Sequence, residues 1–135
     1  MELNKNEILI NKDSLFMDIQ SAFTASYPFL KIDFFTNSNH TDLHKSRLID
    51  PKNPVSKLVK DGSTIRMNIG GNKTVSELSH DFKNTLGLTV QISRKSGNVW
   101  LVVSLTEEWT LQSQNEAGEH ISSEMETIHT HGGHV

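Results

Sequence analysis

The spacing of apolar residues along this chain changes between two periods in a fixed order. Ile8 and Ile10 alternate, as residues on one face of a strand do. The next apolar residues recur at helical intervals on one stripe, and a second alternating run follows them. They are Phe16, Ile19, Phe23 and Tyr27 for the helix, and Leu30, Ile32 and Phe34 for the second strand. This order predicts a strand, a helix and a strand that share one apolar face.

The same order recurs when Ile8 is aligned with Met67. Ile69 then matches Ile10, and the period changes at the same places in both copies. The second set consists of Val75, Leu78, Phe82 and Leu86 at helical spacing, followed by Leu88, Val90 and Ile92 in alternation. Two repeated βαβ units in tandem, at about residues 7–36 and 64–94, predict an α+β fold, a ferredoxin-like βαββαβ sandwich, because a helix that shares an apolar face with strands packs on their sheet.

Signals for helix starts and stops lie where the periods change. Thr74 and Glu77 have the spacing of a capping box, and Gly87 suits the exit of the same helix. In the first unit Asp13 or Ser14 can cap the helix. Local chemistry thus agrees with the apolar pattern about where each helix lies.

A turn signal at residues 95–98, Lys-Ser-Gly-Asn, separates the second unit from another strand-like run. Residues 99–105 are predicted to return as an antiparallel hairpin partner of the strand before them. Apolar residues occupy both faces of this run, which favours a strand covered on both sides. Residues 106 to about 120 then predict a short helix, anchored by Trp109 and Leu111. The hairpin and helix form an extension at residues 95–122.

We expect the 135 residues to form a single α/β domain at 1–122 and a tail at 123–135. The linker 37–63 is longer than an ordinary connection, which is typical of either a functional or a mobile loop. The tail is rich in Glu, His, Ser, Thr and Gly and is predicted to be flexible. The chain has no cysteine, which excludes a disulfide scaffold, a cysteine nucleophile and Cys-ligated metal sites.

Charge is divided unevenly along the chain. The formal net charge is −3, yet ten of the 13 Lys and Arg lie between His44 and Lys95, and six Glu but no Lys or Arg follow Lys95. The division indicates either an interaction surface or an acidic segment that folds back on the basic middle. The acidic average argues against nucleic acid as a partner. Because no apolar run reaches the length of a membrane span and the first residues do not form a secretory signal, we expect a cytoplasmic chain.

Histidines near the C-terminus are the strongest candidates for a chemical site. His129, His131 and His134 can bind zinc, nickel or copper, because neutral imidazole is a common metal ligand. Their spacing matches no named zinc motif, so incidental histidines in a tail are the alternative interpretation. His40 and His44 are expected in a loop.

Other chemical patterns favour structural interpretations. The segment 70–74, Gly-Gly-Asn-Lys-Thr, resembles the end of a phosphate-binding loop, but the motif's first glycine is replaced by Arg66, so a turn before a capped helix is preferred. His80 is expected on the solvent face of the second helix. Phe35 is predicted on the outer face of its strand, where packing against Trp100 or the C-terminal helix is favoured over stacking on RNA bases.

One part of the sequence resembles a known group of proteins. The segment 86–101, LGLTVQISRKSGNVWL, together with Trp109-Thr110-Leu111 and Gln114-Asn115, is similar to a family of small uncharacterised bacterial proteins with paired strand–helix–strand units. The resemblance extends more faintly to residues 29–35 and covers residues 1–122. It implies the same division into units and extension. That family has no established activity, so the resemblance implies no catalytic residue and no cofactor.

The sequence as a whole predicts a non-enzymatic interaction module that binds a protein partner or forms a homo-oligomer. The duplicated compact unit, the division of charge and the lack of a recognisable catalytic constellation favour this role. Two alternatives stay open. One is a metal-handling protein that uses the C-terminal histidines, and the other is an enzyme acting on an unidentified small molecule.

Overall fold

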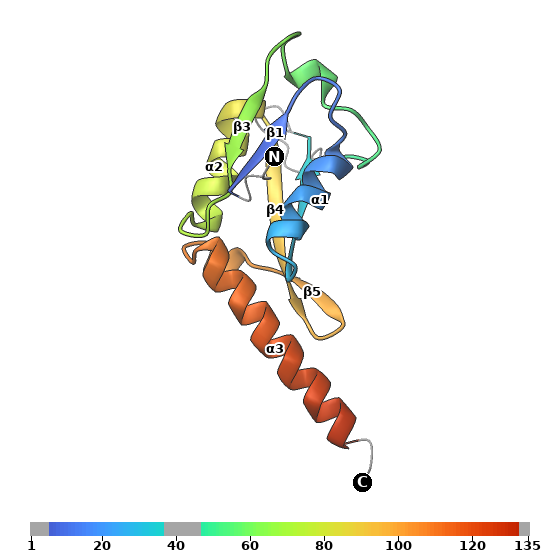
Figure 1. The fold of residues 1–135 in the computed structure, drawn as a ribbon, viewed down its shortest axis with the longest axis vertical. Helices are drawn as coiled ribbons and strands as arrows, with labels where there is room; N and C mark the ends of the chain where they lie inside the picture. The colour runs from blue at the N-terminus through green and yellow to red at the C-terminus, as the bar shows by residue number, and fades with distance from the viewer. Residues whose placement is uncertain (1–5, 37–46, 133–135) are drawn as a thin grey trace, which may run out of the picture.

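The described chain is built from three α-helices and two antiparallel sheets (Figure 1). The computed structural model describes residues 6–36 and 47–132, and of residues 125–132 it describes the backbone alone. In chain order the elements are β1 Glu7–Ile10, α1 Phe16–Ser26, β2 Leu30–Phe35, the 3₁₀ turn η2 Ser56–Leu58, β3 Ile65–Asn68, α2 Val75–Leu86, β4 Thr89–Ser96, β5 Val99–Val102, the 3₁₀ turn η3 Ser104–Thr106 and α3 Leu111–Gly132. The predicted α+β class is confirmed.

The strands form two sheets in place of the single sheet that a ferredoxin-like sandwich requires. β1 pairs with β3, with Ile8 opposite Met67, and β2 pairs with β4, with Ile32 opposite Ile92. β5 continues the second sheet in the order β2-β4-β5. A short hairpin would force β2 and β3 to be neighbours, but the long connection between them lets each strand pair elsewhere. The ferredoxin-like arrangement is therefore not confirmed.

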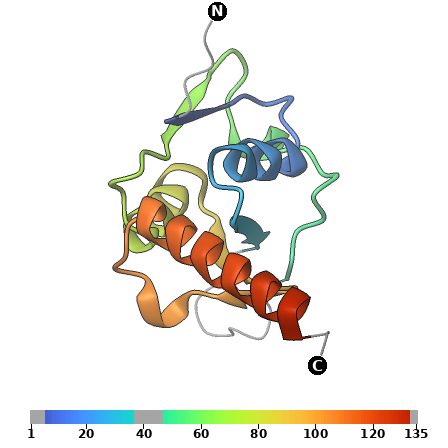
Figure 2. The same cartoon turned by 60° about the horizontal axis from the view of Figure 1, so that its bottom comes forward.

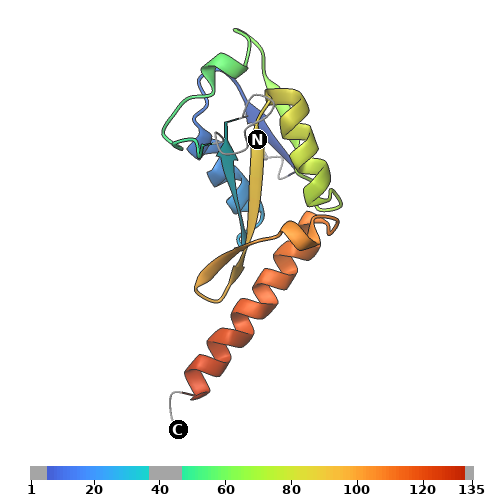
Figure 3. The ribbon, with the colours of Figure 1, turned by 180° about the vertical axis from the view of Figure 1, so that it is seen from behind.

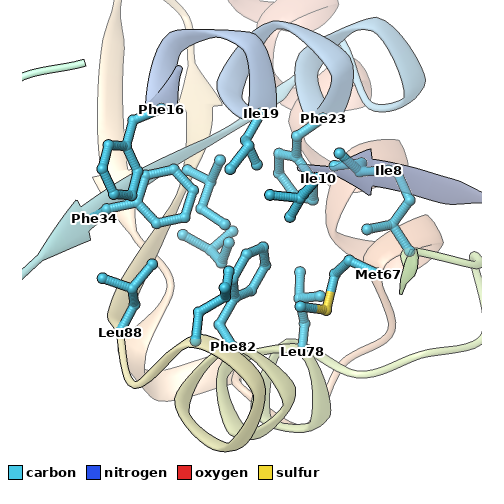
Figure 4. Packing of buried hydrophobic residues seen from close by; sticks show 14 of the residues in the cluster. Ile8, Ile10, Phe16, Ile19, Phe23, Phe34, Met67, Leu78, Phe82 and Leu88 are labelled. Carbon is cyan, nitrogen blue, oxygen red and sulfur yellow. The ribbon is translucent and has the colours of Figure 1, made fainter. Parts of the chain in front are cut away.

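The core lies between α1, α2 and the two sheets (Figure 4). The ring centroid of Phe34 in β2 lies 5.2 Å from that of Phe16 in α1 and 5.5 Å from that of Phe82 in α2. The hydroxyl of Tyr27 donates to the backbone carbonyl of Ile69 and so links the end of α1 to the end of β3. The stripe residues predicted for the two helices are all buried: Phe16, Ile19, Phe23, Tyr27, Val75, Leu78, Phe82 and Leu86.

The two core helices begin in different ways. Thr74 Oγ1 accepts a hydrogen bond from the Glu77 N–H at 3.0 Å, and Glu77 Oε1 accepts one from the Thr74 N–H at 2.9 Å, so the predicted capping box is present. At α1 the chain stays extended at Leu15 (φ −93°, ψ 153°), and its N–H donates to Asp18 Oδ2 at 2.9 Å. Leu15 therefore occupies the cap position that the sequence assigned to residues 13–14.

α3 is longer than the helix predicted from the sequence. It runs to Gly132, whereas the sequence indicated an end near His120 and a flexible tail at 123–135. The apolar spacing explains the extension, because helical intervals continue past His120. The residues concerned are Ile121, Met125 and Ile128. The part of the expected tail that the structure describes is thus helical.

α3 crosses the end of the second sheet and then projects away from the core, next to the β4–β5 hairpin (Figures 1 and 3). Figure 2 shows this crossing from the side on which α3 lies in front of the body. The helix approaches the sheet closely at Gly118, where an added Cβ would lie 2.9 Å from Phe29 Cβ and 3.0 Å from Arg94 Cγ. Asn115 Oδ1 also accepts a hydrogen bond from the Phe29 N–H at 2.8 Å. These contacts fix α3 over β4 and the start of β2.

Candidate interaction surface

Exposed apolar side chains are concentrated in one stretch of the described chain. Ten large apolar side chains are exposed in the whole described chain, and six of them lie between Val99 and Trp109. The six are Val99, Trp100, Leu101, Val102, Leu105 and Trp109. Clusters of exposed apolar residues mark interaction sites more often than single ones do. The β4–β5 hairpin and the turn after it are therefore the first place to look for function.

All four residues of β5 are exposed, with fractions of 54% for Val99, 37% for Trp100, 50% for Leu101 and 49% for Val102. The prediction that this strand is covered on both faces is wrong. α3 passes over β4 and not over β5: Ser122 Oγ donates to the Lys95 carbonyl at 3.4 Å and accepts from the turn at Gly97 N–H at 3.2 Å. β5 therefore lies beyond the helices that cover the rest of the sheet.

β5 is also an edge strand with an open backbone. The Val103 N–H donates to the Ile92 carbonyl at 3.1 Å, and β5 pairs with β4 in an antiparallel register. Because inward and outward backbone groups alternate in such a pair, the N–H and C=O groups of Trp100 and Val102 point away from β4. Within the described chain no strand or bridge pairs with that side of β5. The edge offers two N–H donors and two carbonyl acceptors to another strand.

The outer face of the hairpin combines an aromatic ring with a positive charge. The Lys31 ammonium lies 5.3 Å from the ring centroid of Trp100. Phe35 is paired with Thr89 at the opposite end of β4, whereas Trp100 is paired with Lys95. The predicted packing of Phe35 against Trp100 is therefore wrong, and the distance along the strand is the reason.

A buried polar network holds the base of the hairpin. Gln114 is fully buried; its Oε1 accepts from Arg94 Nη1 at 2.9 Å, and its Nε2 donates to the carbonyl and hydroxyl of Thr106 at 2.7 and 2.8 Å. The Arg94 guanidinium lies 5.6 Å from the Trp109 ring. Sequence reasoning missed this network. The available signal was a glutamine one turn after the buried Leu111, on the apolar stripe of α3.

Residues 70–74, which resemble the end of a phosphate-binding loop, form the turn that the sequence analysis preferred, and an ion pair joins this turn to α2. Lys73 N–H donates to the Gly70 carbonyl at 3.0 Å, and the Lys73 ammonium pairs with Asp81. His80 is exposed on α2, as predicted, and lines a shallow hollow together with Ser76. Since Asp81 is engaged by Lys73, this Ser, His and Asp set does not have the connectivity of a catalytic triad.

A second hollow lies between α1 and the β1–β3 sheet, with a volume of about 280 Å³. Its walls are largely apolar, formed by residues that include Ile8, Leu9 and Ile19. Glu7 and Arg66 at its margin pair with each other at 3.4 Å. This ion pair therefore joins the two strands of the sheet, while Asp18, also at the hollow, caps α1.

The predicted metal ligands fall where side chains are not described. His129 and His131 lie on the backbone of α3, and His134 lies outside the described residues, as do His40 and His44. Among the described side chains no group of three or more His, Cys, Asp or Glu is placed to hold a metal ion. None of the helices in the described part has the length and apolar character needed to cross a membrane.

Comparisons with protein-family models, with curated proteins and with solved structures found no match. The resemblance of residues 86–101 to small bacterial proteins therefore stays a prediction.

Proposed function

We propose that this chain is a non-enzymatic interaction module that binds protein through the open edge of β5. The observation that carries the proposal is a strand with four exposed apolar side chains, no charge and outward N–H and C=O groups at Trp100 and Val102. Folded proteins normally protect such an edge with charges, proline, a bulge or a covering segment. An edge that lacks these features is suited to the addition of a strand from a partner.

The side chains of β5 can contact an added strand on both faces of the sheet. Main-chain hydrogen bonds supply affinity in this mode of binding, and alternate side chains supply selectivity. Trp100 and Val102 lie on one face of the strand, and Val99 and Leu101 lie on the other. Tryptophan is enriched among residues that dominate binding energy at protein interfaces.

The charged groups elsewhere support a non-enzymatic role. Lys73, in the turn before α2, pairs with Asp81 within that helix, and Arg66 pairs with Glu7 across the β1–β3 sheet. Both pairs join neighbouring elements of the fold. Their structural role favours binding over catalysis at the two hollows that they border.

The proposed duplication accounts for why one edge is left open. Ile8 lies opposite Met67, its match in the repeat, and the Ile32–Ile92 and Phe34–Val90 pairs exchange under the same alignment. These registers support two units related by an approximate two-fold axis. β5 has no counterpart in the first unit, so the duplication supplies no strand to cover it.

Site-specific photo-crosslinking tests the proposal. A photo-reactive phenylalanine analogue placed at Leu101 is expected to form adducts with protein in living cells, because this side chain lies at the open edge. The matched control is Leu9, which is 58% exposed on β1 and lies on the other sheet. Equal or absent adduct formation at the two positions would contradict the proposed function.

A further inference from the structure

We propose that the occupant of the β5 edge is β5 of a second copy of this chain, paired antiparallel about a two-fold axis at Leu101. This inference rests on the proposed function of β5 as a protein-binding edge and names the partner. The two three-stranded sheets then join into one continuous sheet. The interface is isologous, which means that both copies contribute the same surface.

The outward backbone groups define the register. A hydrogen-bonded antiparallel pair needs outward groups on both strands, and β5 has them at Trp100 and Val102. With Leu101 on the axis, Trp100 lies opposite Val102 of the partner subunit, and every outward group on both strands is used. Centring the axis on Trp100 would place Val102 opposite the hairpin turn, and centring it on Val102 would place Trp100 opposite η3. Only the Leu101 register pairs all the outward groups.

Charge permits a copy of this strand as the partner. Val99–Val102 carry no charge, so pairing brings no like charges directly opposite each other. The nearest basic residues of β4 are Arg94 and Lys95, which pair with Leu101 and Trp100 within each copy, and the ammonium of Lys31 from β2 lies over the Trp100 ring of its own copy. Across the axis the two β4 strands are three strand spacings apart, about 14 Å. That separation exceeds the screening length of about 8 Å at physiological ionic strength.

Side-chain matching also favours self-pairing. On one face the Trp100 ring meets Val102 of the partner subunit, an aromatic and β-branched pair of the kind that stabilises sheets. The axis repeats this pair, and Leu101 meets the partner's Leu101 on the opposite face. Apolar side chains of the two copies thus contact each other across the axis on both faces of the joined sheet.

The other edge of the sheet explains why assembly stops at two copies. The Thr36 N–H donates to the Arg47 carbonyl at 2.9 Å, and the Ile49 N–H donates to the Phe34 carbonyl at 2.8 Å. A β-bridge between Phe35 and Leu48 lies between these bonds. Residues 47–49 occupy this edge at Phe34 to Thr36, and the side chains of Gln20 and Thr24 donate to the Ile32 and Leu30 carbonyls farther along it. Pairing through β5 therefore uses the open edge of each copy and gives a closed dimer, not a fibre.

The cysteine-free chain allows a direct test by disulfide trapping. In the proposed register the two Leu101 residues form a non-hydrogen-bonded pair with Cα atoms about 4.5 Å apart, which is within the range that a disulfide spans. Purified Leu101→Cys is expected to form a covalent dimer under mild oxidation. Leu9→Cys, at a comparably exposed position on β1, is the matched control and is expected to form no covalent dimer. A mixture of Trp100→Cys and Val102→Cys is expected to cross-link more than either variant alone.

A charge exchange provides a second test that a misfolded variant cannot mimic. Light scattering on the unaltered chain is expected to give twice the mass of one chain. Leu101→Lys and Leu101→Glu each place two like charges on the axis, so each is expected to weaken dimerisation at least tenfold. An equimolar mixture of the two is expected to restore the dimer, because unlike charges then meet. Leu9→Lys controls for charge added elsewhere.

The outcomes separate this inference from the proposed function. A purified chain that stays monomeric at concentrations of several hundred micromolar, or Leu101→Cys and Leu9→Cys chains that cross-link equally, would overturn the second-copy inference. If adducts at Leu101 then join this chain to a different protein in cells, the proposed function stands and the occupant is another chain. If no adduct forms at Leu101 either, both proposals fail.

Discussion

The two edges of the three-stranded sheet differ in how they meet solvent. On β2, residues 47–49 bond to Phe34 and Thr36, and charged residues Lys31 and Asp33 alternate with the buried ones. On β5 the described chain places no covering segment, and the strand carries no charge. Both strands are rich in apolar residues, so apolar content alone does not distinguish them. The difference lies in whether the second face is polar and whether the backbone edge is occupied.

The largest contrast between the two strands is expected in their contribution to folding. Phe34→Ala on β2 removes a ring packed against Phe16 and Phe82 and is expected to lower the free energy of unfolding by about 3–5 kcal/mol. Leu101→Ala on β5 removes a half-exposed side chain and is expected to cost less than about 1 kcal/mol. Urea unfolding followed by far-UV circular dichroism measures both. Similar losses for the two variants would show that β5 is buried in the folded state under the conditions used.

The attachment of the hairpin is expected to depend on one buried amide. Gln114→Ala leaves Arg94 and Thr106 without their partner and is expected to destabilise the fold by about 1–3 kcal/mol. The matched control is Gln112→Ala, because Gln112 is exposed and its side-chain amide donates to Glu116 on the same helix. Hydrogen exchange should report faster opening of β5 than of β2 in the Gln114 variant. Equal protection of both strands would mean that the network does not hold the hairpin in place.

The position of α3 over β4 should be sensitive to a single methyl group. Gly118→Ala places a Cβ within 3.0 Å of Phe29 and Arg94 side-chain atoms, so overpacking is expected. The cost of about 1–3 kcal/mol is partly offset by a gain of about 1 kcal/mol in helix propensity, which leaves a net loss of roughly 1 kcal/mol. Ser123→Ala, on an exposed part of α3, is the control and should leave stability unchanged or slightly raised. If neither variant changes the free energy of unfolding, the stability of the fold does not depend on the close approach of α3 to the sheet at Gly118.

The smallest expected effect is on the pH dependence of stability, and it comes from Glu77 in α2, away from both edges of the sheet. Hydrogen bonds from Thr74, first from its backbone N–H and then from its side chain, hold the pKa of Glu77 below its ordinary value of 4.5. Because the folded state favours the carboxylate, this stabilisation is complete above the ordinary pKa and is lost as pH falls below it. Glu77→Gln should therefore flatten the decline of stability in acid. Leu101→Ala should keep the acid decline of the unaltered chain, because β5 has no titratable side chain. A flattened decline in that variant would contradict the assignment of this pH dependence to Glu77.

The sequence alone determined the features that depend on neighbours along the chain. The helical stripes with Phe23 and Phe82 and the capping box of Thr74 and Glu77 are local, because spacing and short-range hydrogen bonds decide them. The turn before β5 is local as well, and it was predicted for the same reason. In the structure Gly97 adopts a positive φ of 65° in this turn. The α+β class follows from these local elements.

Only the tertiary structure decided which strands pair and which surfaces stay open. The alternation in β1 and β2 does not say whether they share a sheet, because a long connection leaves the choice of partner to packing. The apolar faces of β5 resembled those of a covered strand, yet the place where α3 crosses β4 leaves them exposed. Gln114 looked like one polar residue among many, and its burial depends on Arg94 and Thr106 from distant segments. Long-range contacts thus decide the candidate surface, because exposure is a property of the assembled fold.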